Sequence, residues 1–152
     1  MFSFFKVFFI FIIILVLAPI QYTLVKIKLR YRIYIPIFFH KILLKILGIK
    51  LTIIGEKTSI RPLILAGNHT SYVDIIILGS IMPICFIAKK EIKAWFLFGF
   101  LANLQNTIFI NRKSFKTLES IKNINKVLDI DSALVLFPEG TTNSGRKILK
   151  FK

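Results

Sequence analysis

Acidic side chains are scarce in this 152-residue sequence: seven aspartates and glutamates stand against 22 lysines and arginines, a formal net charge of +15. An excess of positive charge favours an anionic partner. Nucleic acid would suit the charge, but it gives no role to the 16 phenylalanines or to a hydrophobic fraction of 55%. A membrane explains both features, because anionic headgroups attract Lys and Arg. We therefore predict membrane lipids as partners and no nucleic acid.

Cysteine is almost absent from the chain. Cys85 is the only one, which excludes an internal disulfide framework and fits a reducing compartment. It lies in the apolar run Pro-Ile-Cys-Phe-Ile-Ala at residues 83–88. A thiol in such surroundings is typical of a buried structural residue rather than a nucleophile.

Charge is missing altogether between Lys6 and Lys26. As a helix, residues 7–25 would extend roughly 28 Å, close to the roughly 30 Å hydrocarbon core of a bilayer. A signal peptide would have a shorter apolar region that ends at small residues, so the pattern favours a retained anchor. The basic cluster at residues 26–32 outweighs Lys6, which predicts that the rest of the chain lies on the cytoplasmic face of the membrane.

A second apolar stretch at residues 33–47 leaves another arrangement open, because two helices could enter one leaflet without crossing it. Gly48 is placed to end this second helix. We predict that residues 1–47 form a membrane anchor, either a spanning helix or a two-helix motif.

Short apolar runs that are typical of strands follow the anchor, at residues 50–54, 62–66, 84–88, 107–110 and 133–137. Helical stretches separate several of them, most clearly residues 114–128, where apolar side chains form one stripe. Strands that alternate with helices indicate an α/β fold. We expect a mixed sheet flanked by helices, in a single domain over residues 48–152.

A histidine and an aspartate stand five positions apart in Gly-Asn-His-Thr-Ser-Tyr-Val-Asp, residues 67–74. The predicted strand ends before His69, and a helix capped by Thr70 or Ser71 is expected to begin near Tyr72. Asp74 would then lie in the first helical turn and could bind one imidazole nitrogen, leaving the other to accept a proton. The alternative is that Asp74 only complements the helix dipole and His69 only satisfies a turn.

Two further strand ends carry polar groups. Phe-Pro-Glu-Gly at residues 137–140 places Glu139 where α/β sheets bind ligands, and Gly140 would let the backbone approach a substrate. Phe-Ile-Asn-Arg at residues 109–112 offers the guanidinium of Arg112, which suits phosphate or carboxylate. The alternatives are a solvated glutamate in an ordinary turn and a surface arginine.

The order His69-x-x-x-x-Asp74, Phe-Ile-Asn-Arg112, Phe-Pro-Glu139-Gly140 resembles the glycerophospholipid acyltransferase family, of lysophosphatidic acid acyltransferase type. The resemblance runs from about residue 49 to the end. It implies a membrane-bound enzyme that moves a fatty acyl group from acyl-CoA or acyl carrier protein to the free hydroxyl of a lysolipid. The acceptor that it favours is 1-acylglycerol-3-phosphate. It implies no metal and no cofactor, since the acyl donor is a substrate.

The resemblance also implies a role for each residue. His69 would be the general base and Asp74 would orient it, as the carboxylate does in a serine-hydrolase triad. Arg112 would bind the acceptor's phosphate, and Glu139 and Gly140 its glycerol portion. The acceptor hydroxyl attacks the thioester directly, which agrees with the lack of a Gly-x-Ser-x-Gly nucleophile motif.

This chain departs from the family pattern at two places. The family commonly has Arg after Phe-Pro-Glu-Gly-Thr, whereas this chain has Thr142. Members with Thr there acylate related lysolipids such as lyso-ornithine lipid, which is therefore an alternative acceptor. The family also continues beyond the point that corresponds to Lys152, so we expect an acyltransferase domain that is incomplete at its C-terminus. An inactive, membrane-associated remnant is the second alternative.

Overall fold

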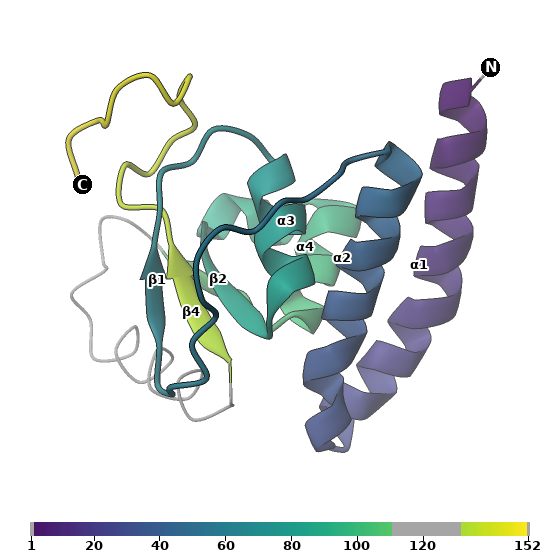
Figure 1. Ribbon diagram of the computed structural model, residues 1–152. Helices are drawn as coiled ribbons and strands as arrows, with labels where there is room; N and C mark the ends of the chain where they lie inside the picture. Colours follow the sequence, from purple (N-terminus) through teal and green to yellow (C-terminus); the bar gives the residue numbers. More distant parts are fainter. Residues whose placement is uncertain (1, 111–131, 152) are drawn as a thin grey trace.

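The computed structural model describes residues 2–110 and 132–151, which form an α/β unit (Figure 1). In chain order the elements are α1 (Phe2–Lys26), the 3-10 helix η1 (Arg30–Ile33), α2 (Tyr34–Leu47), β1 (Ile64–Ala66), α3 (Val73–Ile81), β2 (Ile84–Lys89), the 3-10 helix η2 (Lys90–Ala94), α4 (Phe96–Leu104), β3 (Ile108–Ile110) and β4 (Ala133–Leu136). The helix predicted at residues 114–128 lies outside the described residues.

The sheet has the strand order β1-β4-β2-β3, and every described pair of strands is parallel. The α/β class is therefore confirmed, although the described strands form a parallel sheet rather than a mixed one. Parallel neighbours need a crossover connection, and α3 and α4 supply it between β1 and β2 and between β2 and β3. The last described strand inserts between β1 and β2, so β1 and β4 become neighbours although they are far apart in sequence.

Both faces of the sheet are packed, as is usual for parallel sheets. Ile84, Phe86, Ala133 and Val135 form a buried cluster on one face, against Ile75 and Leu78 of α3 among others. Cys85, Ile108 and Leu134 form a second cluster. Cys85 is 1% exposed and burial raises the pKa of its thiol to about 11, which confirms the predicted structural role.

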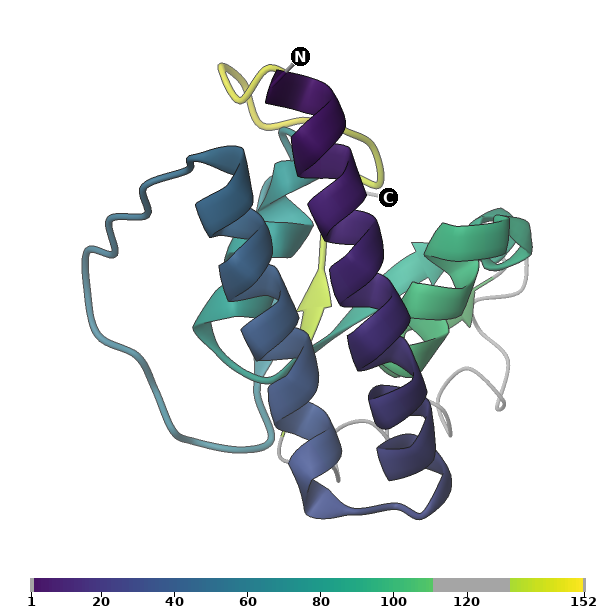
Figure 2. The ribbon, with the colours of Figure 1, turned by 90° about the vertical axis from the view of Figure 1, so that its right-hand side faces the viewer.

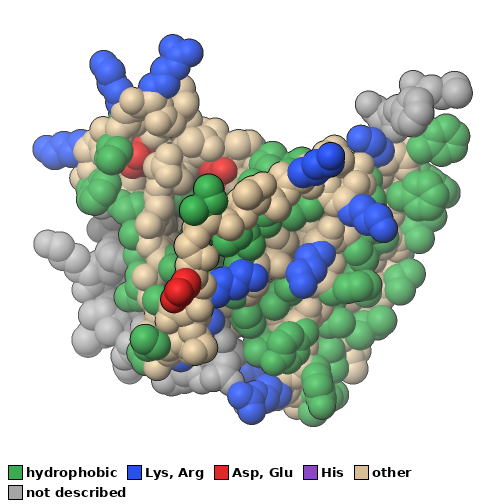
Figure 3. All heavy atoms as spheres, in the orientation of Figure 1, with side chains coloured by type: hydrophobic (Ala, Val, Ile, Leu, Met, Phe, Trp, Pro, Cys, Tyr) green, Lys and Arg blue, Asp and Glu red, His purple; other side chains and the backbone are tan. Residues whose placement is uncertain are grey.

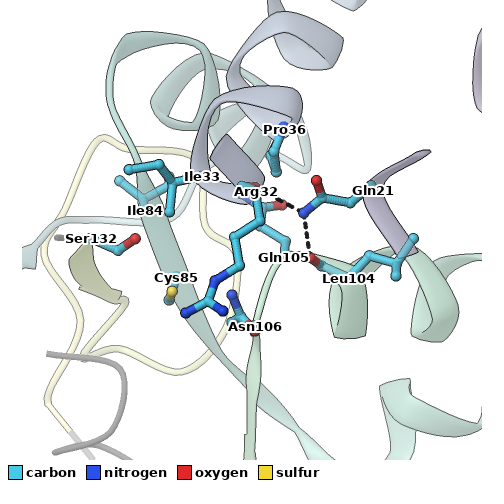
Figure 4. Close-up of a pocket in the computed structure, with 10 residues that line it drawn as sticks. All are labelled: Gln21, Arg32, Ile33, Pro36, Ile84, Cys85, Leu104, Gln105, Asn106 and Ser132. Atoms are coloured by element: carbon cyan, nitrogen blue, oxygen red, sulfur yellow. Dashed lines mark hydrogen bonds between the residues drawn. The ribbon is translucent and has the colours of Figure 1, made fainter. Parts of the chain in front are cut away.

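The two N-terminal helices form an antiparallel hairpin beside α3 and α4 (Figure 2). As predicted, Gly48 ends α2, and its left-handed backbone (φ 76°) is the reason for a glycine there. The side-chain amide of Gln21, on α1, donates hydrogen bonds of 2.9 Å to the carbonyls of Arg32 and Leu104 (Figure 4). The C-terminal part of α1 is thus attached to both η1 and α4.

One predicted strand is wrong. Residues 50–54 form neither strand nor helix, and Ile54 is 95% exposed. The segment alternates apolar and polar residues as a strand does, but no other described strand pairs with it, and a strand needs a partner for its backbone groups. The other four predictions are confirmed, with ends that differ by one or two residues.

Close packing of α2 on α3 depends on Gly79. A Cβ atom added there would lie 2.3 Å from Nδ1 of His40, which is 5% exposed. Burial also lowers the pKa of His40 to about 4, so its imidazole is neutral at physiological pH.

We expect Gly79→Ala to lower the free energy of unfolding by about 1–3 kcal/mol, because the methyl group overpacks the interface. Gly67→Ala, which places a methyl group in open space, is the control. Denaturant unfolding of both variants, and of Gly79→Ala combined with His40→Ala, measures the effect. If the two substitutions are simply additive, the contact between these residues is not the cause.

Candidate functional site

The loop that joins β1 to α3 brings His69 and Asp74 together. Nδ1 of His69 lies 2.9 Å from Oδ2 of Asp74, so the two side chains are paired as the sequence predicts. The same Oδ2 accepts hydrogen bonds from the backbone amides of Thr70 (2.7 Å) and Ser71 (3.0 Å). The hydroxyl of Thr70 donates to the other oxygen, Oδ1, at 3.2 Å.

These donors keep Asp74 ionised. Burial alone would raise the pKa of this carboxyl group, but the hydrogen bonds from Ser71, His69 and Thr70 together lower it below the ordinary value. Asp74 also lies in the first turn of α3, whose N-terminal dipole favours a negative charge. Nδ1 of His69 therefore faces a carboxylate and carries a proton, which leaves Nε2 in the unprotonated, basic form.

The helix start differs slightly from the prediction. Tyr72 is the N-cap of α3, without a side-chain cap bond, rather than Thr70 or Ser71. The hydroxyl of Ser71 nevertheless accepts a hydrogen bond from the Val73 amide at 3.2 Å.

Phe137 supports the imidazole from the neighbouring loop. Its ring stacks on that of His69 with a centroid distance of 4.1 Å and an interplanar angle of 13°. The side chain of His69 remains 15% exposed, so the ring reaches the surface at one edge. The sequence placed Phe137 at the strand end but gave no sign of this contact, because nothing local specifies which loop lies opposite.

Glu139 is buried, with 1% of its surface exposed. The alternative of a solvated turn glutamate is therefore wrong. Asn143 donates a hydrogen bond from Nδ2 to Oε2 of Glu139, and Oε1 has no hydrogen-bond partner within residues 2–110 and 132–151. Gly140 follows with a left-handed backbone (φ 64°) that favours glycine.

The parallel register explains why two distant motifs meet. Ala66 at the end of β1 pairs with Leu136 at the end of β4. His69 and Glu139 each follow those strand ends by three residues, so both motifs leave the same edge of the sheet (Figure 1). Arg112, the third predicted site residue, lies outside the described residues.

A pocket lies at the edge of the sheet opposite to these loops, beside the first residues of β2 (Figure 4). Arg32, Cys85, Asn106 and Ser132 are among the residues that line it. It is separate from the loops that carry His69 and Glu139, since Cys85 lies near the start of β2 while those loops follow the ends of β1 and β4.

Comparison with known proteins identifies relatives of this chain. A family model described as "Acyltransferase" matches residues 50–152. The chain is 39% identical over 137 residues to a lyso-ornithine lipid O-acyltransferase of Brucella abortus, covering 90% of this chain and 51% of that protein. It is 37% identical over 139 residues to a protein of the same name in Rhizobium meliloti, covering 91% and 48%.

A 1-acyl-sn-glycerol-3-phosphate acyltransferase of Neisseria gonorrhoeae is 38% identical over 90 residues, covering 59% of this chain and 35% of that protein. The chain spans about half the length of the curated relatives that it matches over most of its residues. No solved structure matches it.

Proposed function

Because the chain belongs to the glycerophospholipid acyltransferase family, we propose that it transfers a fatty acyl group from a thioester donor to the free hydroxyl of a lysolipid. The observation that carries this proposal is the 2.9 Å pairing of His69, in the loop that joins β1 to α3, with Asp74, in the first turn of α3. An ionised carboxylate on Nδ1 makes Nε2 available as a general base. The donor is acyl-CoA or acyl carrier protein.

The proposed reaction needs no nucleophile from the protein. The lysolipid oxygen attacks the thioester carbonyl carbon while Nε2 of His69 takes the hydroxyl proton. The carbon–sulfur bond then breaks, and the imidazolium returns the proton to the leaving thiolate. Asp74 stabilises the imidazolium between these steps. Glu139 and Gly140 would hold the glycerol portion of a phosphoglycerol acceptor, and Arg112 would bind its phosphate.

Two acceptors are candidates. The order of motifs supports 1-acylglycerol-3-phosphate. Thr142, at the position where the family commonly has Arg, supports lyso-ornithine lipid, and so do the two relatives named for that activity, which match nine-tenths of the chain.

Purified full-length chain in mixed vesicles, supplied with acyl-CoA or acyl carrier protein and with each lysolipid in turn, tests the proposal. Mass spectrometry of the lipids reads the product. We expect the diacyl form of at least one acceptor. Donor consumption without any acylated lysolipid would contradict the proposal.

We further propose that α1 anchors the chain in one leaflet, with the catalytic loops on the cytoplasmic side. Among the described helices, α1 alone is long and apolar enough to cross a membrane. Its residues are mostly exposed up to Leu17, whereas Ala18 and Gln21 are buried against the rest of the chain. The exposed part would rise only about 21 Å from Phe4 to Leu17, short of the roughly 30 Å needed to span.

Hydrophobic side chains cover this part of α1 on the face seen in Figure 3. We expect Phe8→Asp combined with Phe11→Asp to release most of the protein from vesicles, because each charge costs about 2.5–3.5 kcal/mol inside a bilayer. Phe8 and Phe11 are 51% and 53% exposed, so the fold should survive. Phe151→Asp, at a position 65% exposed outside α1, is the matched control. Vesicle sedimentation measures binding, and equal release of both variants would argue against anchoring by α1.

A further inference from the structure

Asn143 lies where the loops after β1 and β4 meet. Its backbone amide donates a 2.8 Å hydrogen bond to the carbonyl oxygen of His69. Its side-chain Nδ2 donates to Oε2 of Glu139, and its side-chain Oδ1 accepts the backbone amide of Gly145 at 2.5 Å. One residue thus contacts the backbone of the imidazole residue, the buried carboxylate and the turn that follows.

The turn itself packs against the β1–α3 loop. Gly145 has a left-handed backbone (φ 73°), and a Cβ atom built there would lie 3.1 Å from the methyl group of Thr70. Thr70 in turn donates two hydrogen bonds to Asp74, from its amide and its hydroxyl. The position of Asn143 is therefore fixed from both sides, by the loop that carries His69 and by its own turn.

The Glu139 carboxylate depends on the side-chain amide of Asn143. Its carboxylate is 1% exposed, and a buried carboxylate is costly unless hydrogen bonds satisfy it. Nδ2 of Asn143 is the donor to it that the described residues provide. Without that donor the buried carboxylate loses the hydrogen bond that the described residues provide, which favours movement of its loop toward water.

We propose that Asn143 is a positioning residue that holds the Glu139 carboxylate and the His69 backbone in one fixed arrangement, which keeps the His69 imidazole in place for the acceptor lipid. This inference rests on the proposed acyl transfer. Asn143 does not touch the reacting atoms; it acts through the two residues it binds. Neither its bond to His69 nor its bond to Glu139 contributes to the hydrophobic core, so its effect should fall on the site.

Two substitutions separate positioning from folding. Asn143→Asp keeps the shape of the side chain but replaces the donor with an acceptor beside Glu139. Two adjacent carboxylates in a buried place repel each other when both are ionised, and protonation of one of them restores a hydrogen bond between them. Asn143→Ala removes the side-chain donor, and no change of pH restores it. Both variants keep the backbone bond to His69.

We expect each variant to lower kcat/KM for the lysolipid by about 10²-fold at pH 8, the order of loss that a small misplacement of reacting groups causes. As the pH falls toward 6, the deficit of Asn143→Asp relative to the unmodified chain should shrink, while that of Asn143→Ala stays constant. All three proteins share His69 and Asp74, so the ratio of their rates isolates the effect of the introduced carboxyl group. Ser144→Ala, an exposed neighbour, should change nothing.

Amide hydrogen exchange of residues 67–74 provides a readout that is independent of activity. We expect faster exchange in Asn143→Ala and no change in Ser144→Ala. If the unmodified chain transfers no acyl group but exchange changes in this way, the proposed function fails and the positioning role stands. If exchange is unchanged, or if both variants lose the same activity at every pH, the positioning role is overturned.

Discussion

Replacing His69 with Ala should reduce acyl transfer by about 10²–10⁴-fold, the usual contribution of a general base. The imidazole has two partners, the Asp74 carboxylate at 2.9 Å and the Phe137 ring stacked at 4.1 Å. Neither partner needs His69 to keep its place, since Asp74 still accepts the Thr70 and Ser71 amides. The loss should therefore be chemical rather than structural.

Three measurements on the His69→Ala protein make this distinction. Initial rates of lysolipid acylation give the loss, circular dichroism during thermal unfolding reports the fold, and vesicle sedimentation reports membrane binding. We expect the last two to match the unmodified chain. A variant that retains more than about a tenth of the rate would be incompatible with a general base, which contributes at least about a hundredfold.

Replacing Asp74 with Asn should be nearly as damaging, with a loss of about 10²–10⁴-fold. The amide oxygen can still accept the Thr70 and Ser71 amides, so the start of α3 survives. The negative charge that fixes the proton on Nδ1 and stabilises the imidazolium is gone. Asp74→Ala removes the acceptor as well and should also destabilise the chain, by about 0.5–2 kcal/mol, as loss of a helix cap does.

The pH dependence of the unmodified chain follows from the same contacts. The pKa of Asp74 lies below its ordinary value of 3.8, so the folded state binds this proton less tightly than the unfolded chain does. The stability that Asp74 contributes is therefore present above pH 3.8 and is lost as the pH falls through its lower folded pKa. Activity that is lost well above that range is not lost through protonation of Asp74, which is still ionised there. An Asp74→Asn variant as active as the unmodified chain would contradict a role for the Asp74 carboxylate in the reaction.

The sequence predicted the pairing of His69 with Asp74 better than it predicted the sheet. His69 and Asp74 were expected to pair because a strand end and a helix start leave only a short loop between them, and local geometry then decides the contact. Strand order is not local. The insertion of β4 between β1 and β2, which brings Glu139 beside the His69 loop, depends on packing across the whole sheet.

Three failures have the same origin. Residues 50–54 have the pattern of a strand but no described partner, and pairing partners are not visible in a local pattern. Asn143 gave no signal because an asparagine in a polar turn is ordinary, and its importance comes from the loop opposite. The stacking of Phe137 on His69 escaped prediction for that reason too.

The central claim is that the imidazole of His69 takes a proton from the acceptor hydroxyl. The most direct test compares two acceptors in the unmodified chain and in His69→Ala: a lysolipid, and the same lipid with an amine in place of the free hydroxyl. At alkaline pH a neutral amine attacks a thioester without a base. We predict a loss of about 10²-fold or more with the hydroxyl acceptor and a much smaller loss with the amine. Equal losses with both acceptors would contradict the claim.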